Sequence, residues 1–379
     1  MPIIRKTGAL RAAQGLMPPA SFDPTYGYSL ADLEQCAAPQ PADEPADFDQ
    51  FWDGLREAAR AMDPVPTLGP WSPWMYESGF PKNDDGYEIA DLTFTSVGDV
   101  QLGGWVVRPV GGATQIAVCG HGYGGREKPE CDDVAPDALC VYPVARGLPT
   151  RSLVPDIGSG VGQTHHVLWG IESPRTYAPI LSAADFSVAA TVAIELFEAE
   201  CRARSNTTGS ATPSENAPLI YHGGSFGGGA GIMALSIDDR FTGAVVSVPT
   251  FGNQVVRVTQ HSEGSGQIVR EFVAEHPEAL ETLQYADAAS AARRVRVPVV
   301  AFPALADGVV PPPGQFSVVN SLAGPVWRHV LAGGHGDWDD FDPEVRSENP
   351  SDWAGDGQVA RLSPNTIAQF LREPTPLVA

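Results

Sequence analysis

The chain has 379 residues, which is enough for one large or two ordinary domains, and its 43% hydrophobic and 18% charged residues are globular values that exclude whole-chain disorder. Its 24 basic and 46 acidic residues give a formal net charge of −22, and a field of that sign repels nucleic-acid phosphates and anionic membrane surfaces. We therefore expect a small neutral or cationic ligand as the partner, no nucleic acid and no membrane.

The first 46 residues are rich in Pro, Ala and Gly and show little periodicity, so we expect an N-terminal arm over 1–46 and a single domain over 47–379. Met1–Leu10 lacks the apolar run of a signal peptide, and we expect no window of about 20 apolar residues, which favours a cytoplasmic protein. The odd number of cysteines and the absence of a Cys-x-x-Cys pair favour reduced thiols, mostly in the core, at Cys36, Cys119, Cys131, Cys140 and Cys201.

The first regular element is a helix from about Asp47 to Met62, in which Phe48, Phe51, Trp52 and Leu55 recur at helical spacing. Alternating residues in Tyr87–Thr95 and Leu102–Val107 then predict two antiparallel strands joined by a turn at Gly98-Asp99, ahead of the main sheet.

Short apolar runs that are typical of strands buried on both faces follow at 116–119, 138–142, 219–222, 244–248 and 299–302. Helical stretches at 180–201, 229–237 and 286–294 separate most of them, which predicts a mostly parallel, doubly wound α/β sheet. A last strand over 326–331 and a helix near 365–372 close it, and residues 250–285 interrupt the alternation where we expect a small cap-like insertion.

The most specific local pattern is Gly223-Gly224-Ser225-Phe226-Gly227, a Gly-x-Ser-x-Gly sequence between a predicted strand and a predicted helix. A serine on so sharp a turn needs small residues two positions before and after it, because neighbouring backbones nearly touch. A flexible glycine loop or a phosphate-binding loop is the alternative, although the Lys-Ser/Thr of a P-loop is missing. The pattern predicts Ser225 as a nucleophile.

An acid and a histidine follow in the order that this kind of nucleophile requires. Asp307 comes after the predicted strand 299–302, and His335 comes after the next one. An ordinary Asp-Gly turn is the alternative interpretation of Asp307. Other candidate acids near His335 are Asp337, Asp339 and Asp340, which we expect to form a solvated acidic loop, with a cation site as the alternative. We predict the catalytic residues Ser225, Asp307 and His335.

The backbone N–H of Phe226 is the expected first donor of an oxyanion hole, and the loop Gly120–Gly125, which follows the strand 116–119, is expected to supply the second. An ordinary glycine-rich turn is the alternative for that loop. A zinc site at His165-His166 with nearby acids is an alternative, but these residues lack a metal-ligand spacing, so we predict no metal site.

Several motifs in order resemble the acetyl xylan esterase/cephalosporin C deacetylase family of α/β-hydrolases. They are 47–52, His121–Gly125, Arg146-Gly147, Gly170–Tyr177, the sequence around Ser225, Leu283–Asp287, and Asp307 followed by Pro311-Pro312. The resemblance implies an α/β-hydrolase fold, deacetylation of small or sugar-borne esters without a cofactor, a homo-oligomer, and Tyr123 as the second oxyanion donor.

The sequence departs from that family where Leu148, Phe226 and Gly336 replace polar residues. We expect Leu148 and Phe226 to line the substrate pocket and to favour less polar esters, because burying a sugar hydroxyl without a partner costs roughly 1 to 3 kcal/mol. The leading hypothesis is a serine esterase that acts through an acyl-enzyme. An acyltransferase or amidase with the same residues, and a non-catalytic ligand-binding protein, are the alternatives.

Overall fold

The computed structural model describes residues 22–76, 83, 85–130, 134–154, 165–208, 217–335 and 371, and for residues 207 and 208 only the backbone. Cys131, Asp337, Asp339, Asp340, Gly336 and most of the predicted helix near 365–372 lie outside this part. Within this part, Cys36, Cys119, Cys140 and Cys201 form no disulfide bond, and the last three are buried.

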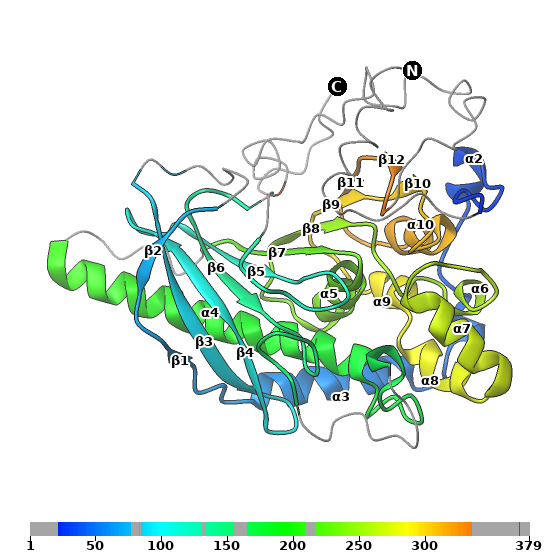
Figure 1. Cartoon of the computed structure of the whole chain (residues 1–379), viewed down its shortest axis with the longest axis horizontal. Helices are drawn as coiled ribbons and strands as arrows, with labels where there is room; N and C mark the ends of the chain where they lie inside the picture. Colours follow the sequence, from blue (N-terminus) through cyan, green and yellow to red (C-terminus); the bar gives the residue numbers. More distant parts are fainter. Residues whose placement is uncertain are drawn as a thin grey trace.

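One twisted sheet of ten strands organises the described residues (Figure 1). Its order is β1-β3-β4-β6-β5-β7-β8-β9-β11, with β2 paired to β3. The strands on this path and beside it are β1 (Thr67–Leu68), β2 (Ser72–Trp74), β3 (Tyr87–Ser96), β4 (Val100–Pro109), β5 (Gln115–Cys119), β6 (Ala138–Pro143), β7 (Leu219–Gly224), β8 (Gly243–Ser247), β9 (Val299–Phe302) and β11 (Val326–Arg328).

The pairing changes from antiparallel to parallel along the sheet. All pairs from β1 to β6 are antiparallel, and all pairs from β6 through β5, β7, β8 and β9 to β11 are parallel. The predicted fold class is confirmed, but the first strands are continuous with the main sheet, because β4 pairs with β6 over Gly104–Val107.

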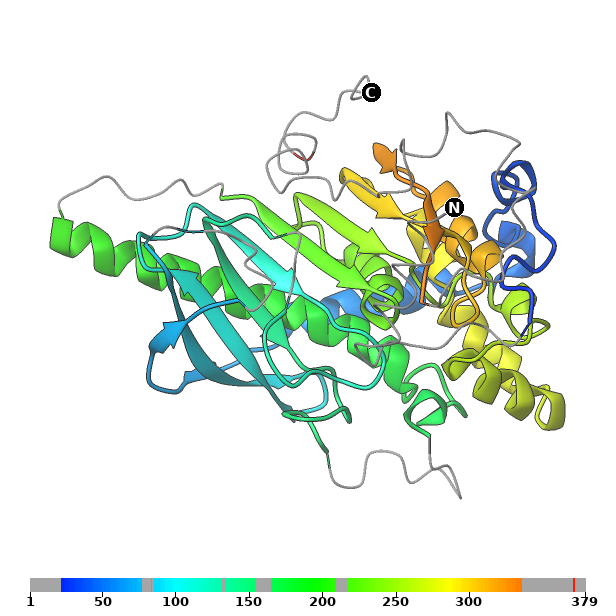
Figure 2. The same ribbon diagram turned by 45° about the horizontal axis from the view of Figure 1, so that its top comes forward.

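The helices pack against this sheet or lie at the end opposite β1–β4. They are α2 (Leu30–Leu33), α3 (Phe48–Ala61), α4 (Ala178–Thr208), α5 (Phe226–Ile237), α6 (Gln254–Arg257), α7 (Ser265–Glu275), α8 (Ala279–Tyr285), α9 (Ala288–Ala292) and α10 (Pro312–Asn320), with short 3-10 turns η1 (Pro41–Asp43) and η2 (His166–Leu168). Figures 1 and 2 show α4 running along the sheet from the β1–β4 end, with α6, α7 and α8 at the opposite end.

Alternate residues of the central strands pack on opposite faces of the sheet, as the period of two requires. Tyr221, Val246 and Ala301 belong to the large core that contains α4 and α5. Ile220, Val245 and Val300 belong to a smaller cluster with Leu371. Both faces of the parallel strands are therefore covered, which explains why their sequences are almost entirely apolar.

The predicted last strand, 326–331, is two strands in the structure. β11 continues the main sheet beside β9, whereas β12 (Leu331–Gly333) pairs in parallel with β10 (Ala304–Ala306) in a separate two-stranded sheet. The break matters because Asp307 follows β10 directly and His335 lies two residues beyond β12.

The N-terminal arm packs against this same region. Leu33 in α2 is fully buried against Leu305 and Phe316. The backbone N–H of Asp307 donates a 2.9 Å hydrogen bond to the carbonyl of Pro24. The arm therefore packs on the loop that carries the predicted acid, a contact that composition alone did not indicate.

Helix α4 corrects one expectation. The stretch Ala178–Asn206 is long and apolar enough to cross a membrane by length and composition alone, although no such window was expected. Most of it is buried inside the protein, where it packs on α5, β5 and β6. We interpret α4 as the core helix of the α/β fold.

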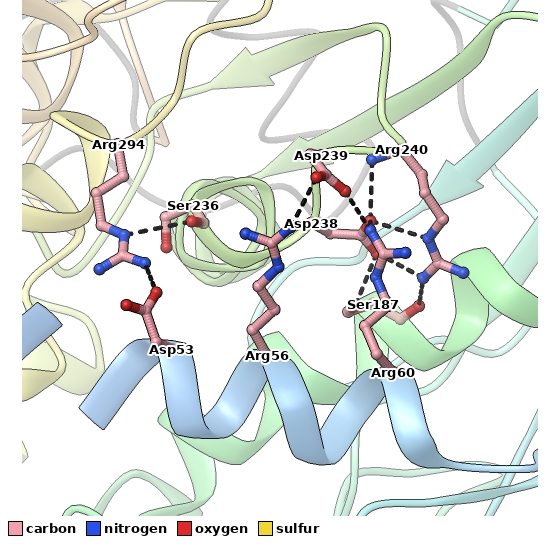
Figure 3. A network of polar contacts seen from close by, with 9 residues as sticks. All are labelled: Asp53, Arg56, Arg60, Ser187, Ser236, Asp238, Asp239, Arg240 and Arg294. Atoms are coloured by element: carbon pink, nitrogen blue, oxygen red, sulfur yellow. Dashed lines mark hydrogen bonds and ion pairs between the residues drawn. The ribbon is translucent and has the colours of Figure 1, made fainter. Parts of the chain in front are cut away.

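A network of charges joins α3 to the core beneath α5 (Figure 3). The fully buried Asp238 carboxylate accepts hydrogen bonds from Arg240 at 2.7 and 2.9 Å, from Ser187 at 2.7 Å and from Arg60 at 3.0 Å. Burial acts to raise the pKa of Asp238, but hydrogen bonds and charge from Arg240 together with the Ser187 hydroxyl hold it below its usual value.

This network predicts that Asp238→Asn destabilises the protein far more than Asp239→Asn. We expect Asp238→Asn to cost about 2 to 3 kcal/mol, less than for a fully buried pair, because Arg60 and Arg240 remain partly solvated. Asp239, whose side chain is 66% exposed, should cost under about 1 kcal/mol. Urea unfolding measures both, and equal losses would contradict the central role of Asp238.

Candidate active site

The predicted site residues gather at one edge of the sheet. The carboxyl ends of parallel strands meet at the same edge, and loops at this edge form the sites of open α/β folds. Here β5 leads into the loop with Tyr123, β7 leads into Ser225, and β9 and β10 lead to Asp307.

Ser225 occupies a strained turn between β7 and α5. Its φ of 54° and ψ of −116° lie outside the regions that a serine ordinarily adopts. The neighbouring strand helps to hold this conformation, since the Ser225 N–H donates to Ser247 O at 2.9 Å. A Cβ on Gly227 would come within 2.7 Å of the His121 carbonyl, so only glycine fits there. These are the features of a nucleophile elbow.

Asp307 and His335 are in direct contact. His335 Nδ1 lies 2.7 Å from Asp307 Oδ2. The register of the small sheet explains the contact, because β10 and β12 pair Ala306 with Gly333 and so place the two following loops side by side. A side chain on Gly334 would overlap the Asp307 carboxylate, so this position also requires glycine.

The Asp307 carboxylate has three further partners. Its Oδ1 accepts the backbone N–H groups of Val309 and Val310 at 2.9 and 3.0 Å, and its Oδ2 accepts Gln315 Nε2 at 2.9 Å. Gln315 is fully buried and is itself fixed by the N–H of Ala304. Gln315 was not predicted from the sequence; it lies in α10, which begins at Pro312, and its nearness to the predicted acid in the chain was the available signal.

Two backbone N–H groups remain unpaired beside the elbow. Within the described residues, neither the Phe226 nor the Tyr123 N–H donates a hydrogen bond, and the two rings pack edge to face with centroids 5.1 Å apart. Free donors at a helix start and in the loop after an early strand match the requirement for binding an oxyanion.

Two neutral histidines support this loop. His121 accepts the Ala145 N–H at Nε2, so its Nδ1 carries the proton donated to Gly122 O. His166 donates from Nε2 to Arg146 O at 2.8 Å and accepts the Tyr123 hydroxyl at Nδ1 at 2.7 Å. Burial lowers the pKa of His121 to about 3 and that of His166 to about 4.

The Arg146 loop is anchored by a buried ion pair. The Arg146 guanidinium donates to both oxygens of Asp185 at 2.6 and 2.9 Å, and Ser96 also donates to Asp185 at 2.6 Å. A continuous chain of hydrogen bonds thus leads from α4 through Arg146 and His166 to Tyr123.

Phe226 and Leu148, the residues predicted to line a substrate pocket, are both buried. Phe226 has no exposed surface and contacts the rings of His121, Tyr123, His166 and Phe251. The Phe226 side chain therefore packs in the interior against Tyr123 of the loop Gly120–Gly125, and contact of either Phe226 or Leu148 with a substrate stays a prediction.

The sequence alternative of a metal at His165-His166 finds no support in this geometry. Both ring nitrogens of His166 already have protein partners. Among the residues that the structure describes, no group of three His, Cys, Asp or Glu side chains is arranged to hold a metal ion.

The two buried histidines predict a pH-dependent stability. Between pH 6.5 and about 4 the unfolded chain binds a proton on each histidine that the folded protein does not, so stability falls as pH falls, by about 1.4 kcal/mol per pH unit for each. Urea unfolding of His166→Gln should show about 2 kcal/mol less loss between pH 7 and pH 5 than the wild type. The exposed His276→Gln serves as the control, and identical pH slopes for His166→Gln and wild type would show that His166 is not held neutral.

Comparison with known proteins agrees with this geometry. Residues 208–335, which include the elbow, Asp307 and His335, match the family model of acetyl xylan esterase (AXE1). Among solved structures, acetyl xylan esterase 1 from Thermoanaerobacterium sp. JW/SL YS485 is similar, with a TM-score of 0.65, 19% identity, and coverage of 83% of this chain and 94% of that one. The acetyl xylan esterase from Paenibacillus sp. R4 has a TM-score of 0.62 and 21% identity, with 82% and 94% coverage.

The structural matches show the fold, and the family match covers the segment that carries the predicted nucleophile, acid and histidine. Together with the mixed, mostly parallel sheet, the structural matches show the α/β-hydrolase fold, and the family match over residues 208–335 supports a carboxylic ester hydrolase similar to the acetyl xylan esterases.

Proposed function

We propose that the protein is a serine esterase that hydrolyses small carboxylic esters of the acetyl type through an acyl-enzyme. The observation that carries the proposal is the 2.7 Å contact between His335 Nδ1 and Asp307 Oδ2, at the sheet edge where Ser225 occupies its strained turn. A histidine held in this way through Nδ1 leaves Nε2 to act as a base.

In this mechanism Ser225 Oγ attacks the ester carbonyl carbon while His335 Nε2 takes the hydroxyl proton. The carbonyl oxygen becomes an oxyanion, which the N–H groups of Phe226 and Tyr123 stabilise. The tetrahedral intermediate collapses, the C–O bond to the alcohol breaks, and His335 returns the proton to the leaving alkoxide. Water, deprotonated by His335, then attacks the acyl-serine, releases the carboxylic acid and restores the Ser225 hydroxyl.

Asp307 orients the imidazole and stabilises the imidazolium that forms in each half of the reaction. Its four hydrogen bonds, from His335, Gln315, Val309 and Val310, fix the position and the plane of the carboxylate. An uncharged amide at this position would keep the shape but present the wrong partner to Nδ1.

We infer an acetyl-type substrate from the names of the similar proteins, which are acetyl xylan esterases. Transfer of the acyl group to an acceptor other than water, or cleavage of an amide, would use the same residues. Hydrolysis of p-nitrophenyl esters of increasing acyl length tests activity and acyl selectivity together.

We expect Ser225→Ala, His335→Ala and Asp307→Asn each to reduce kcat for p-nitrophenyl acetate by on the order of 10⁴-fold, with folding unchanged. Asp99→Asn, in the turn between β3 and β4, is the matched control and should keep full activity. A Ser225→Ala protein that folds normally and retains more than about a tenth of wild-type turnover would refute the serine mechanism.

A further inference from the structure

A second buried arginine, near the candidate site, has no carboxylate partner among the residues that the structure describes. Arg257, at the end of α6, is 5% exposed, and the only hydrogen bond of its side chain within the described residues runs from Nη1 to Gln254 Oε1 at 3.2 Å. Its guanidinium carbon lies 5.4 Å from the centre of the Phe251 ring. Arg146, buried to a similar extent, is instead paired with Asp185.

The carboxylate of Asp287 acts on Arg257 through space but does not pair with it. Its oxygens accept the backbone N–H groups of Asn253, Gln254, Ala289 and Ser290 at 2.7 to 3.2 Å. Asp287 therefore fixes the starts of α6 and α9, and the charge of Arg257 stays without a direct counter-ion among the described residues.

Two buried hydroxyl groups without partners lie near this guanidinium. The Ser262 and Tyr177 residues are 2% and 0% exposed, and neither hydroxyl has a hydrogen-bond partner in the part of the chain that the structure describes. A Cβ on Gly266 would lie 2.9 Å from Ser262 Oγ and 3.3 Å from Arg257 Nη2, so both groups border the same spot. The charge of Arg257 also acts on the Tyr177 hydroxyl, whose pKa is raised by burial and partly lowered by Arg257.

This cluster is linked both to Phe226 and Tyr123 and to the loop that carries Asp307. On one side Phe251 contacts the Phe226 ring at 5.9 Å, and the charge of Arg257 acts on Tyr123. On the other side the backbone N–H of Glu263, which follows Ser262, donates to Gly308 O at 2.7 Å, next to Asp307. A group bound to Arg257 and Ser262 would therefore lie near both the loop that carries Tyr123 and the loop that carries Asp307.

A buried cation without a counter-ion is costly, and hydroxyl donors without acceptors add to that cost. One bound carboxylate would remove both of these free-energy costs, because it can pair with the guanidinium group and still accept hydrogen bonds from the neighbouring hydroxyls. We propose that Arg257, Ser262 and Tyr177 bind a carboxylate of the ester substrate, so that the enzyme acts on esters that also carry a free acid group.

The proposal rests on the esterase function and revises the expectation of a neutral or cationic ligand. The net charge of −22 repels anions at long range, so a preference for an anionic ester must come from a local site. The ratio of kcat/KM for a charged ester to kcat/KM for its neutral counterpart therefore measures how much Arg257 contributes to binding the acid group.

The test compares kcat/KM for two matched pairs of esters. Monomethyl succinate against methyl valerate places the acid on the acyl side, and 4-acetoxybenzoate against its methyl ester places it on the alcohol side. In at least one pair we expect the charged-to-neutral ratio to fall about tenfold or more in Arg257→Gln and to recover in part in Arg257→Lys. Ratios equal to wild type in both pairs would overturn the proposal and leave Arg257 a structural residue solvated by water.

A binding measurement separates this proposal from the esterase function. Succinate and 4-hydroxybenzoate are added to Ser225→Ala and to Ser225→Ala combined with Arg257→Gln, and the Tm is recorded. A rise that depends on Arg257 supports the site even if no ester is hydrolysed, and no rise with either acid counts against it. If Arg257→Gln does not fold, Ser262→Ala takes its place, and an unchanged ratio and Tm response in that variant would overturn the proposal.

Discussion

The strained turn at Ser225 is the constraint on which the rest of the site depends. A serine with a φ of 54° persists because β8 and the loop after β5 pack closely against the turn from β7 into α5, where a Cβ on Gly227 would lie 2.7 Å from the His121 carbonyl oxygen. That contact couples two loops, since the Gly227 N–H donates to His121 O at 2.8 Å. The same close packing that aims the Ser225 side chain therefore also places the Tyr123 loop beside the first N–H groups of α5.

Buried polar groups then fix the loops in relation to this turn. Asp185, Arg146 and His166 form a chain that ends at the Tyr123 hydroxyl, whereas Gln315 and two backbone amides hold Asp307. Each group in these chains has a partner, so each contributes rigidity without an uncompensated charge. Arg257 departs from this pattern because, among the described residues, its guanidinium hydrogen-bonds only to the Gln254 amide, lies near the Phe251 ring and borders the same spot as the unpartnered Ser262 hydroxyl.

The net charge of the chain and the local environment of a buried arginine have different effects on a ligand. A net charge of −22 describes the field far from the surface, which salt screens within about 10 Å at 0.1 M. Inside the protein, one arginine without a carboxylate partner can dominate the local potential. Composition therefore indicates which macromolecules the protein repels, and it is a poor guide to the charge of a small substrate.

The sequence by itself determined the α/β order, the buried strands and the Gly-x-Ser-x-Gly turn, because apolar runs and glycine spacing are local consequences of burial and backbone geometry. It also indicated Ser225, Asp307 and His335 through their order at predicted strand ends. Only the tertiary structure decided that residues 326–331 split into two strands, that Phe226 packs in the core, and that Pro24 and Arg257 lie near the predicted site residues. These features depend on contacts between segments far apart in the chain, for which no local pattern of residues provides a signal.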